Sequence, residues 1–145
     1  MSIRFSHVGV CVSDLERSVR FYEGLGFERA QSHEVGEEFG ALMEIDGVRL
    51  ESQFLRQEGV TIELLHFAAP GHSGAGTRRP LNELGLTHLS VRVDDVDAAI
   101  RTVEALGGSV VRGTRTTFGD GEAALDFVYC TDPDGVRVEL MRLPG

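Results

Sequence analysis

An internal repeat is the feature of this sequence that most restricts its fold. Residues 7–26 align without a gap with residues 88–107, and eight of the twenty pairs are identical. A second match aligns residues 59–65 with residues 135–141, each a Gly-Val step that leads into an apolar run with one glutamate. Chance is a poor explanation for two matches in the same order, so the pattern indicates a duplicated structural unit. The second match has the shorter offset, which predicts extra length in the first copy, within residues 34–58.

Each copy has the pattern of a strand, a helix and three further strands. In the first strand Val8, Val10 and Val12 alternate with polar or small residues, so His7 is expected on the opposite face. Ser13 and Glu16 have the spacing of a capping box and predict the start of the first helix. Turn-forming residues then separate short β-type runs. The pattern predicts one βαβββ module per copy.

The expected domain organisation follows from the repeat and from the βαβββ pattern of each copy. We expect an α+β fold with one module over residues 1–67 and another over residues 86–145. Together they would form an incompletely closed, barrel-like curved sheet around a metal cavity. Residues 68–85 contain several glycines and two prolines and are expected to be a linker that also forms the cavity rim. Residues 37–45 are ambiguous between helix and strand, and a short inserted helix is the expectation.

Charge and composition exclude several classes of protein. The chain has 145 residues and a formal net charge of −9, which disfavours nucleic acid as a partner because phosphates are also negative. Its apolar runs are only a few residues long, far short of a membrane span, and the first residues do not resemble a signal peptide. A cytoplasmic protein with a small-molecule substrate is expected.

Four residues at repeated positions are the candidate metal ligands. Glu63 and Glu139 lie in apolar strands. Burying an unpaired carboxylate in such a strand costs roughly several kcal/mol. Strand parity places both on the face that points away from the helices, together with His7 and His88. Because two similar modules bring equivalent residues together at an approximate twofold axis, these four side chains are expected to converge on one divalent cation. Two imidazoles and two carboxylates suit Zn, Ni, Co, Mn or Fe.

The alternative is that each of these residues is an ordinary strand-end histidine or solvent-facing glutamate, as most single His and Glu residues are. The symmetric occurrence of all four favours a metal site. His33, His66 and His72 have no counterpart in the other copy and are expected to be surface or loop residues.

The duplicated module, the two His-containing strand starts and the segment Asp-Pro-Asp-Gly-Val-Arg-Val-Glu-Leu at 132–140 resemble the vicinal oxygen chelate superfamily. The resemblance covers nearly the whole chain. That superfamily includes glyoxalase I, methylmalonyl-CoA epimerase, extradiol dioxygenases, fosfomycin-modifying enzymes and bleomycin-binding proteins. The resemblance therefore implies a fold more firmly than a reaction.

The ligand set resembles that of glyoxalase I, because dioxygenases and fosfomycin enzymes use only two His and one Glu and have no ligand equivalent to Glu63. In glyoxalase I an arginine four residues beyond the first ligand holds the glutathione carboxylate, whereas Cys11 stands there in this chain. Arg92 has the equivalent place in the second copy and is expected to bind an anionic part of the substrate. The long segment between Glu63 and His88 is more similar to methylmalonyl-CoA epimerase.

These resemblances imply a metal-dependent lyase or isomerase that moves a proton at a carbon next to a carbonyl group. Glu139 is the first candidate for the catalytic base and Glu63 the second. Two other functions stay open: a non-catalytic binding or resistance protein, and a metal-dependent dioxygenase. A homodimer is expected, with the metal site either within one chain or shared across the dimer interface.

Overall fold

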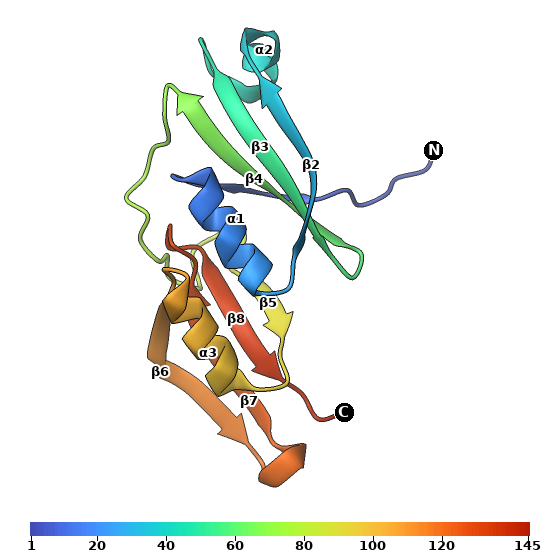
Figure 1. The fold of residues 1–145 in the computed structure, drawn as a ribbon, viewed down its shortest axis with the longest axis vertical. Helices are drawn as coiled ribbons and strands as arrows, with labels where there is room; N and C mark the ends of the chain where they lie inside the picture. The colour runs from blue at the N-terminus through green and yellow to red at the C-terminus, as the bar shows by residue number, and fades with distance from the viewer. The chain divides into compact units, whose positions relative to one another are not determined.

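The computed structural model describes all residues 1–145. The chain divides into two compact units, residues 1–74 and residues 75–145, called here the first and second modules. The first contains β1 (Val8–Cys11), α1 (Leu15–Gly24), β2 (Glu28–Val35), β3 (Arg49–Gln57) and β4 (Val60–Ala69) (Figure 1). The second contains β5 (Leu89–Arg92), α3 (Val96–Ala105), β6 (Ser109–Phe118), β7 (Leu125–Thr131) and β8 (Arg137–Arg142).

Each module has one four-stranded mixed sheet with the same topology. The strand orders are β1-β4-β3-β2 and β5-β8-β7-β6. The first strand of each module pairs in parallel with the last, and the other neighbours are antiparallel. The two sheets are not joined into a closed barrel. The predicted α+β fold of two tandem βαβββ modules is therefore confirmed.

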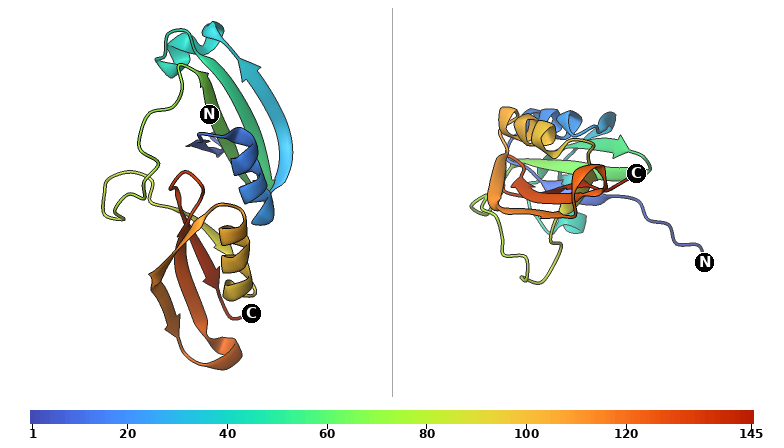
Figure 2. Two further views of the ribbon diagram at one scale, coloured as in Figure 1. Left: turned by 60° about the vertical axis from the view of Figure 1, so that its left-hand side comes forward. Right: turned by 90° about the horizontal axis from the view of Figure 1, so that it is seen from below.

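One face of each sheet is covered by the helix of its own module, as Figure 2 shows. In the first module Val19 of α1 is buried together with Ile62 and Leu64 of β4, and α1 contacts β3 and β4. In the second module α3 contacts β7 and β8, and its buried residues share a core with Val138 and Leu140. Because side chains alternate along a strand, Glu63 and Glu139 lie on the opposite face, as their parity predicts.

The first helix begins one residue later than the capping box of Ser13 and Glu16 predicts. Asp14 is the N-cap of α1 and accepts a hydrogen bond from the backbone N–H of Arg17 at 2.9 Å. Asp95 caps α3 in the same way, with the N–H of Ala98 at 2.9 Å. The Ser13 hydroxyl instead accepts from the Arg17 guanidinium at 2.8 Å. Aspartate caps a helix N-terminus as well as serine does, and Asp14 stands next to Ser13. The predicted capping box of Ser13 and Glu16 is therefore wrong.

Short helical segments interrupt the connections between strands. The segment that was ambiguous in the sequence forms a 3₁₀ turn, Glu37–Phe39, followed by α2 (Gly40–Met43). Another 3₁₀ turn, Gly121–Ala123, lies between β6 and β7. Residues 70–88 form no helix or strand. None of the helices has the length and apolar character needed to cross a lipid bilayer.

A cluster of charged residues connects the helix α3 of the second module to the strands β6 and β7 of its sheet. Arg115 on β6 donates two hydrogen bonds to the Asp126 carboxylate on β7, at 3.2 and 2.7 Å, and also pairs with Asp97 on α3. The hydrogen bonds from Arg115 hold the pKa of the Asp126 carboxyl below its ordinary value, and Thr117 adds to this effect. Asp126 is only 7% exposed. Its ionised form therefore depends on Arg115.

Replacing Arg115 by alanine is expected to lower the free energy of unfolding by about 1–3 kcal/mol at pH 7, because a buried carboxylate loses its partner. A lowered folded-state pKa stabilises the protein above the ordinary aspartate pKa of about 3.9 and loses this effect as the pH falls through the folded-state value. The difference between the variant and the wild type should therefore shrink below about pH 4. Urea unfolding at pH 7 and pH 3 measures this.

The matched control is Arg112→Ala on the same strand. Arg112 pairs with Glu104 at 2.5 Å, but the two side chains are 69% and 43% exposed. An exposed pair of this kind contributes less than about 1 kcal/mol. An Arg115 variant that is no less stable than the Arg112 variant would contradict a structural role for the Arg115 cluster.

Candidate metal centre

In the first module a histidine and a glutamate meet on the face of the sheet opposite α1. His7 directly precedes β1, and Glu63 lies on β4, the parallel neighbour of β1. Gly9 is the register partner of Glu63, so His7 lies close enough for its ring to reach the carboxylate. The His7 Nε2 atom is 3.1 Å from Glu63 Oε2, with side chains that are 33% and 17% exposed. Two potential metal ligands are thus adjacent and partly shielded from solvent.

The second module repeats this arrangement. His88 directly precedes β5, and Glu139 lies on the parallel strand β8. The His88 Nε2 atom is 3.6 Å from Glu139 Oε2, with side chains that are 26% and 19% exposed. Of the four predicted ligands, the structure thus brings His7 to Glu63 and His88 to Glu139.

Each histidine is oriented by a hydroxyl group and an aromatic ring. The Ser6 hydroxyl lies 2.8 Å from His7 Nδ1, and the Thr87 hydroxyl lies 2.9 Å from His88 Nδ1. Phe54 packs edge-to-face on His7 with ring centroids 5.1 Å apart. These contacts direct the Nε2 atom of each imidazole toward its glutamate.

An aromatic ring has the same place in the second module, where Tyr129 packs edge-to-face on His88 at 5.2 Å. Phe54 is the register partner of Glu63, and Tyr129 is that of Glu139. Sequence reasoning missed both rings. An aromatic residue on the strand before each glutamate was the available signal, but the register that pairs them could not be derived from the pattern.

The chemistry of each pair fits a divalent cation. A hydroxyl group can donate or accept a hydrogen bond, so Ser6 and Thr87 allow either imidazole tautomer. When Nδ1–H donates to the hydroxyl, the lone pair of Nε2 faces a carboxylate oxygen, and a cation between them can bind both atoms. Neither module by itself gathers three or more His, Cys, Asp or Glu side chains placed to hold a metal ion. The quartet of His7, Glu63, His88 and Glu139 stays a prediction that needs one pair from each module.

Polar groups surround the pair in the second module. Burial and the negative charge of Glu139 raise the pKa of the Tyr129 phenol, while the nearby Arg137 opposes this, so the hydroxyl stays protonated at neutral pH. Arg137 is buried, lies 5.0 Å from the centre of the Tyr129 ring and donates to the backbone carbonyl of Arg79 at 2.7 Å. In the first module Phe54 offers no hydroxyl at this place.

The other predicted residues lie as follows. Arg92 is exposed, and its guanidinium donates to the carbonyl oxygens of Leu143 and Pro144 at 3.4 and 3.2 Å. Its role in binding a substrate anion stays a prediction. His33 and His66 lie on strands: His33 packs against Phe54 at 5.7 Å, and His66 pairs with Glu51 at 3.3 Å. His72 is exposed in the segment after β4.

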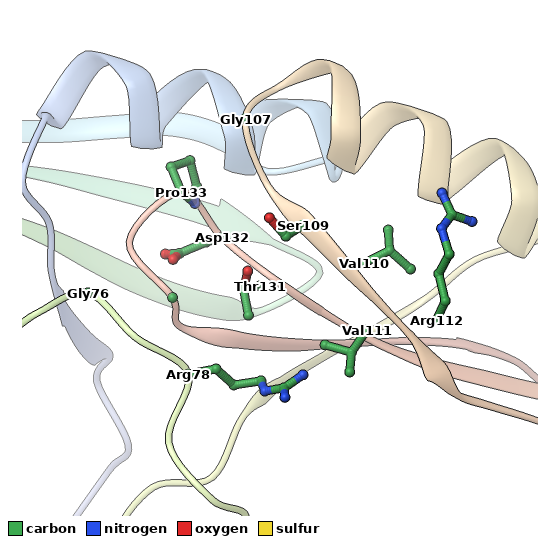
Figure 3. A pocket seen from close by; sticks show the side chains of 11 residues that line it. Gly76, Arg78, Gly107, Ser109, Val110, Val111, Arg112, Thr131, Asp132 and Pro133 are labelled. Carbon is green, nitrogen blue, oxygen red and sulfur yellow. The ribbon is translucent and has the colours of Figure 1, made fainter.

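The second module also has an open pocket of about 680 Å³ beside the β7–β8 turn. Figure 3 shows Ser109, Thr131 and Asp132 around it, with Arg78 and Arg112 at its sides. Neither His88 nor Glu139 lines this pocket. It is therefore separate from the His–Glu pair of the same module.

Comparison with known proteins agrees with the fold. The family model described as the Glyoxalase/Bleomycin resistance protein/Dioxygenase superfamily matches residues 4–140. A 2-epi-5-epi-valiolone epimerase from an Actinomyces species is 33% identical, over 99% of this chain and 81% of that protein. A probable lactoylglutathione lyase from Vibrio parahaemolyticus is 30% identical, over 96% of this chain and 90% of that protein.

Among solved structures, a glyoxalase family protein from Bacillus cereus is similar with a TM-score of 0.83. Its sequence identity is 21%, and the match covers 100% of this chain and 97% of that one. At this identity the likeness concerns the fold alone. The family match extends over nearly the whole sequence, so this chain belongs to the glyoxalase/bleomycin resistance protein/dioxygenase superfamily.

Proposed function

We propose that this protein is a divalent-metal-dependent enzyme of the lyase or isomerase type that moves a proton at a carbon next to a carbonyl group. Relatives named lactoylglutathione lyase and epimerase support an enzyme of the lyase or isomerase type. The substrate would be a small molecule with neighbouring oxygens.

One observation carries the proposal: the same local arrangement occurs twice. In each module an imidazole Nε2 faces a glutamate oxygen, a hydroxyl from the preceding residue holds Nδ1, and an aromatic ring packs against the imidazole. Each pair presents one imidazole nitrogen and one carboxylate oxygen, two of the donor types that a divalent cation binds. Together His7, Glu63, His88 and Glu139 would supply four ligands to one cation.

A bound divalent cation supplies positive charge that stabilises the negative charge developing on the substrate oxygens. His7 and His88 would hold it through Nε2, and Glu63 and Glu139 would each hold it through a carboxylate oxygen. Glu139 is the proposed base: the substrate C–H bond breaks, the proton moves to a Glu139 oxygen, and the electron pair of that bond delocalises onto the carbonyl oxygen. Glu139 then returns the proton to carbon, and Glu63 is the second candidate for this role.

The competing class is a binding protein that holds a small molecule without turnover. Elemental analysis of the purified protein distinguishes the two, followed by assays with hemithioacetals and acyl-CoA epimers. We expect about one divalent ion per chain and a lower melting temperature after treatment with a chelator, since a ligand bound only by the folded state stabilises it. Protein that retains no divalent ion after loading, and melts at the same temperature with chelator, would contradict the proposal.

A homodimer is proposed as the working assembly, because each four-stranded sheet has two edge strands and one face that its own helix does not cover. The metal site would then lie within one chain or be shared by two. Sedimentation of the metal-loaded and chelator-treated protein tests this: a dimer that dissociates only without metal supports a shared site.

A further inference from the structure

The two modules differ at the residue that stands two positions after the histidine. In the second module this residue is Ser90, whose hydroxyl donates a hydrogen bond to Glu139 Oε2 at 2.8 Å. In the first module it is Gly9, which has no side chain. The register is the same in both, because Ser90 pairs with Glu139 and Gly9 pairs with Glu63. The repeat therefore supplies one glutamate with a hydroxyl partner and leaves the other without this contact.

The distances in the two modules reflect this difference. Glu63 Oε2 lies 3.1 Å from the Nε2 of His7. Glu139 Oε2 lies 3.6 Å from the Nε2 of His88, which is too long for a hydrogen bond, and it bonds instead to Ser90. Ser90 Oγ is also 3.2 Å from Met141 Sδ. Because a hydroxyl has one proton and a carboxylate is a much stronger acceptor than a thioether, Glu139 is its main acceptor.

We propose that Ser90 is a positioning residue that gives Glu139 a second resting position on the protein, apart from the cation. This inference rests on the proposed function. A carboxylate released from the cation is a stronger base than a bound one, and Ser90 stabilises the released position of Glu139. Gly9 offers no such position to Glu63. Ser90 thus makes Glu139, rather than Glu63, the carboxylate that exchanges a proton with the substrate carbon.

The first test is the affinity of the metal-free protein for Zn²⁺, measured by competition with a chromophoric chelator. Ser90→Ala removes the hydroxyl that competes with the cation for Glu139, so it is expected to bind Zn²⁺ about ten-fold more tightly than the wild type. Ser90→Thr keeps the hydroxyl and should match the wild type. The proposal would be overturned if Ser90→Ala bound Zn²⁺ ten- to hundred-fold more weakly than the wild type. That loss is roughly the cost of removing a group that supports a bound ligand. An unchanged affinity would overturn it too.

The repeat offers a matched control at Gly9. Gly9→Ser places a hydroxyl beside Glu63, where the added Cβ would lie 3.2 Å from the flexible end of Leu65. This variant is expected to bind Zn²⁺ several-fold more weakly than Gly9→Ala, which adds the same Cβ without the hydroxyl. Equal affinities of the two Gly9 variants would contradict the proposal.

The second test separates kcat from KM in the Zn²⁺-saturated enzyme. Ser90→Ala should lower kcat about ten-fold with little change in KM, and Ser90→Thr should restore kcat. Unchanged kcat in Ser90→Ala would overturn the positioning role. Failure of the proposed function looks different, because the wild type itself would then bind no Zn²⁺, whatever residue stands at position 90.

Discussion

Replacing Glu139 by glutamine is expected to lower turnover by about 10²–10⁴-fold, the usual contribution of general acid–base catalysis. Glutamine has the same size and can still accept a hydrogen bond from Ser90, but its amide cannot take the proton from the substrate carbon. Glu139 is half-buried on the face of β8 that α3 does not cover, so the substitution should leave the fold intact. Steady-state kinetics with the metal-saturated variant, together with thermal unfolding, measure both effects.

The matched control is Glu63→Gln, which changes the equivalent residue of the first module. It is expected to weaken Zn²⁺ binding as Glu139→Gln does, but to retain more turnover once the protein is saturated with metal. Turnover of Glu139→Gln close to that of the wild type would remove the proposed base. Equal losses in both variants would instead assign proton transfer to the two carboxylates together.

Replacing His88 by alanine is expected to lower the affinity for Zn²⁺ by more than about 100-fold, because losing a direct ligand exceeds the roughly 10–100-fold cost of losing a supporting group. The same loss is expected for His7→Ala, since the two histidines have equivalent contacts. Chelator competition at constant pH measures the affinity of each variant. Circular dichroism checks that the sheet content is retained.

His66→Ala is the control for these variants. His66 is also a partly buried strand histidine paired with a glutamate, Glu51, at 3.3 Å, but it has no counterpart in the second module. Its removal should leave Zn²⁺ affinity unchanged. A His66 variant that loses affinity as strongly as the His88 variant would show that the repeat is not the feature that identifies ligands.

The sequence predicted the fold well because duplication and strand alternation act over long stretches. Two copies of one hydrophobic pattern require the same arrangement of strands and helix, and the alternating valines assign His7 to the uncovered face. The helix starts were less predictable. Asp14 and Ser13 are adjacent residues with similar capping ability, and local pattern could not choose between them.

Strand parity predicted that the two histidines and the two glutamates lie on the uncovered faces. The pairing of each histidine with the glutamate of its own module comes from the parallel pairing of the first and last strands. The contacts of Tyr129 and Ser90 were not predictable. They depend on the register between neighbouring strands, which aligns Tyr129 of β7 and Ser90 of β5 with Glu139 of β8. This register comes from the packing of whole strands, and a single strand's pattern does not encode it.

The central claim is that both modules contribute to one cation site. Crystals of the Zn²⁺-loaded protein, with diffraction data collected on both sides of the zinc absorption edge, test it most directly. One anomalous peak is expected, with the Nε2 atoms of His7 and His88 and oxygens of Glu63 and Glu139 about 2.0–2.2 Å away, from one chain or from two chains of a dimer. A peak at other residues, or ligands from only one kind of module, would contradict it.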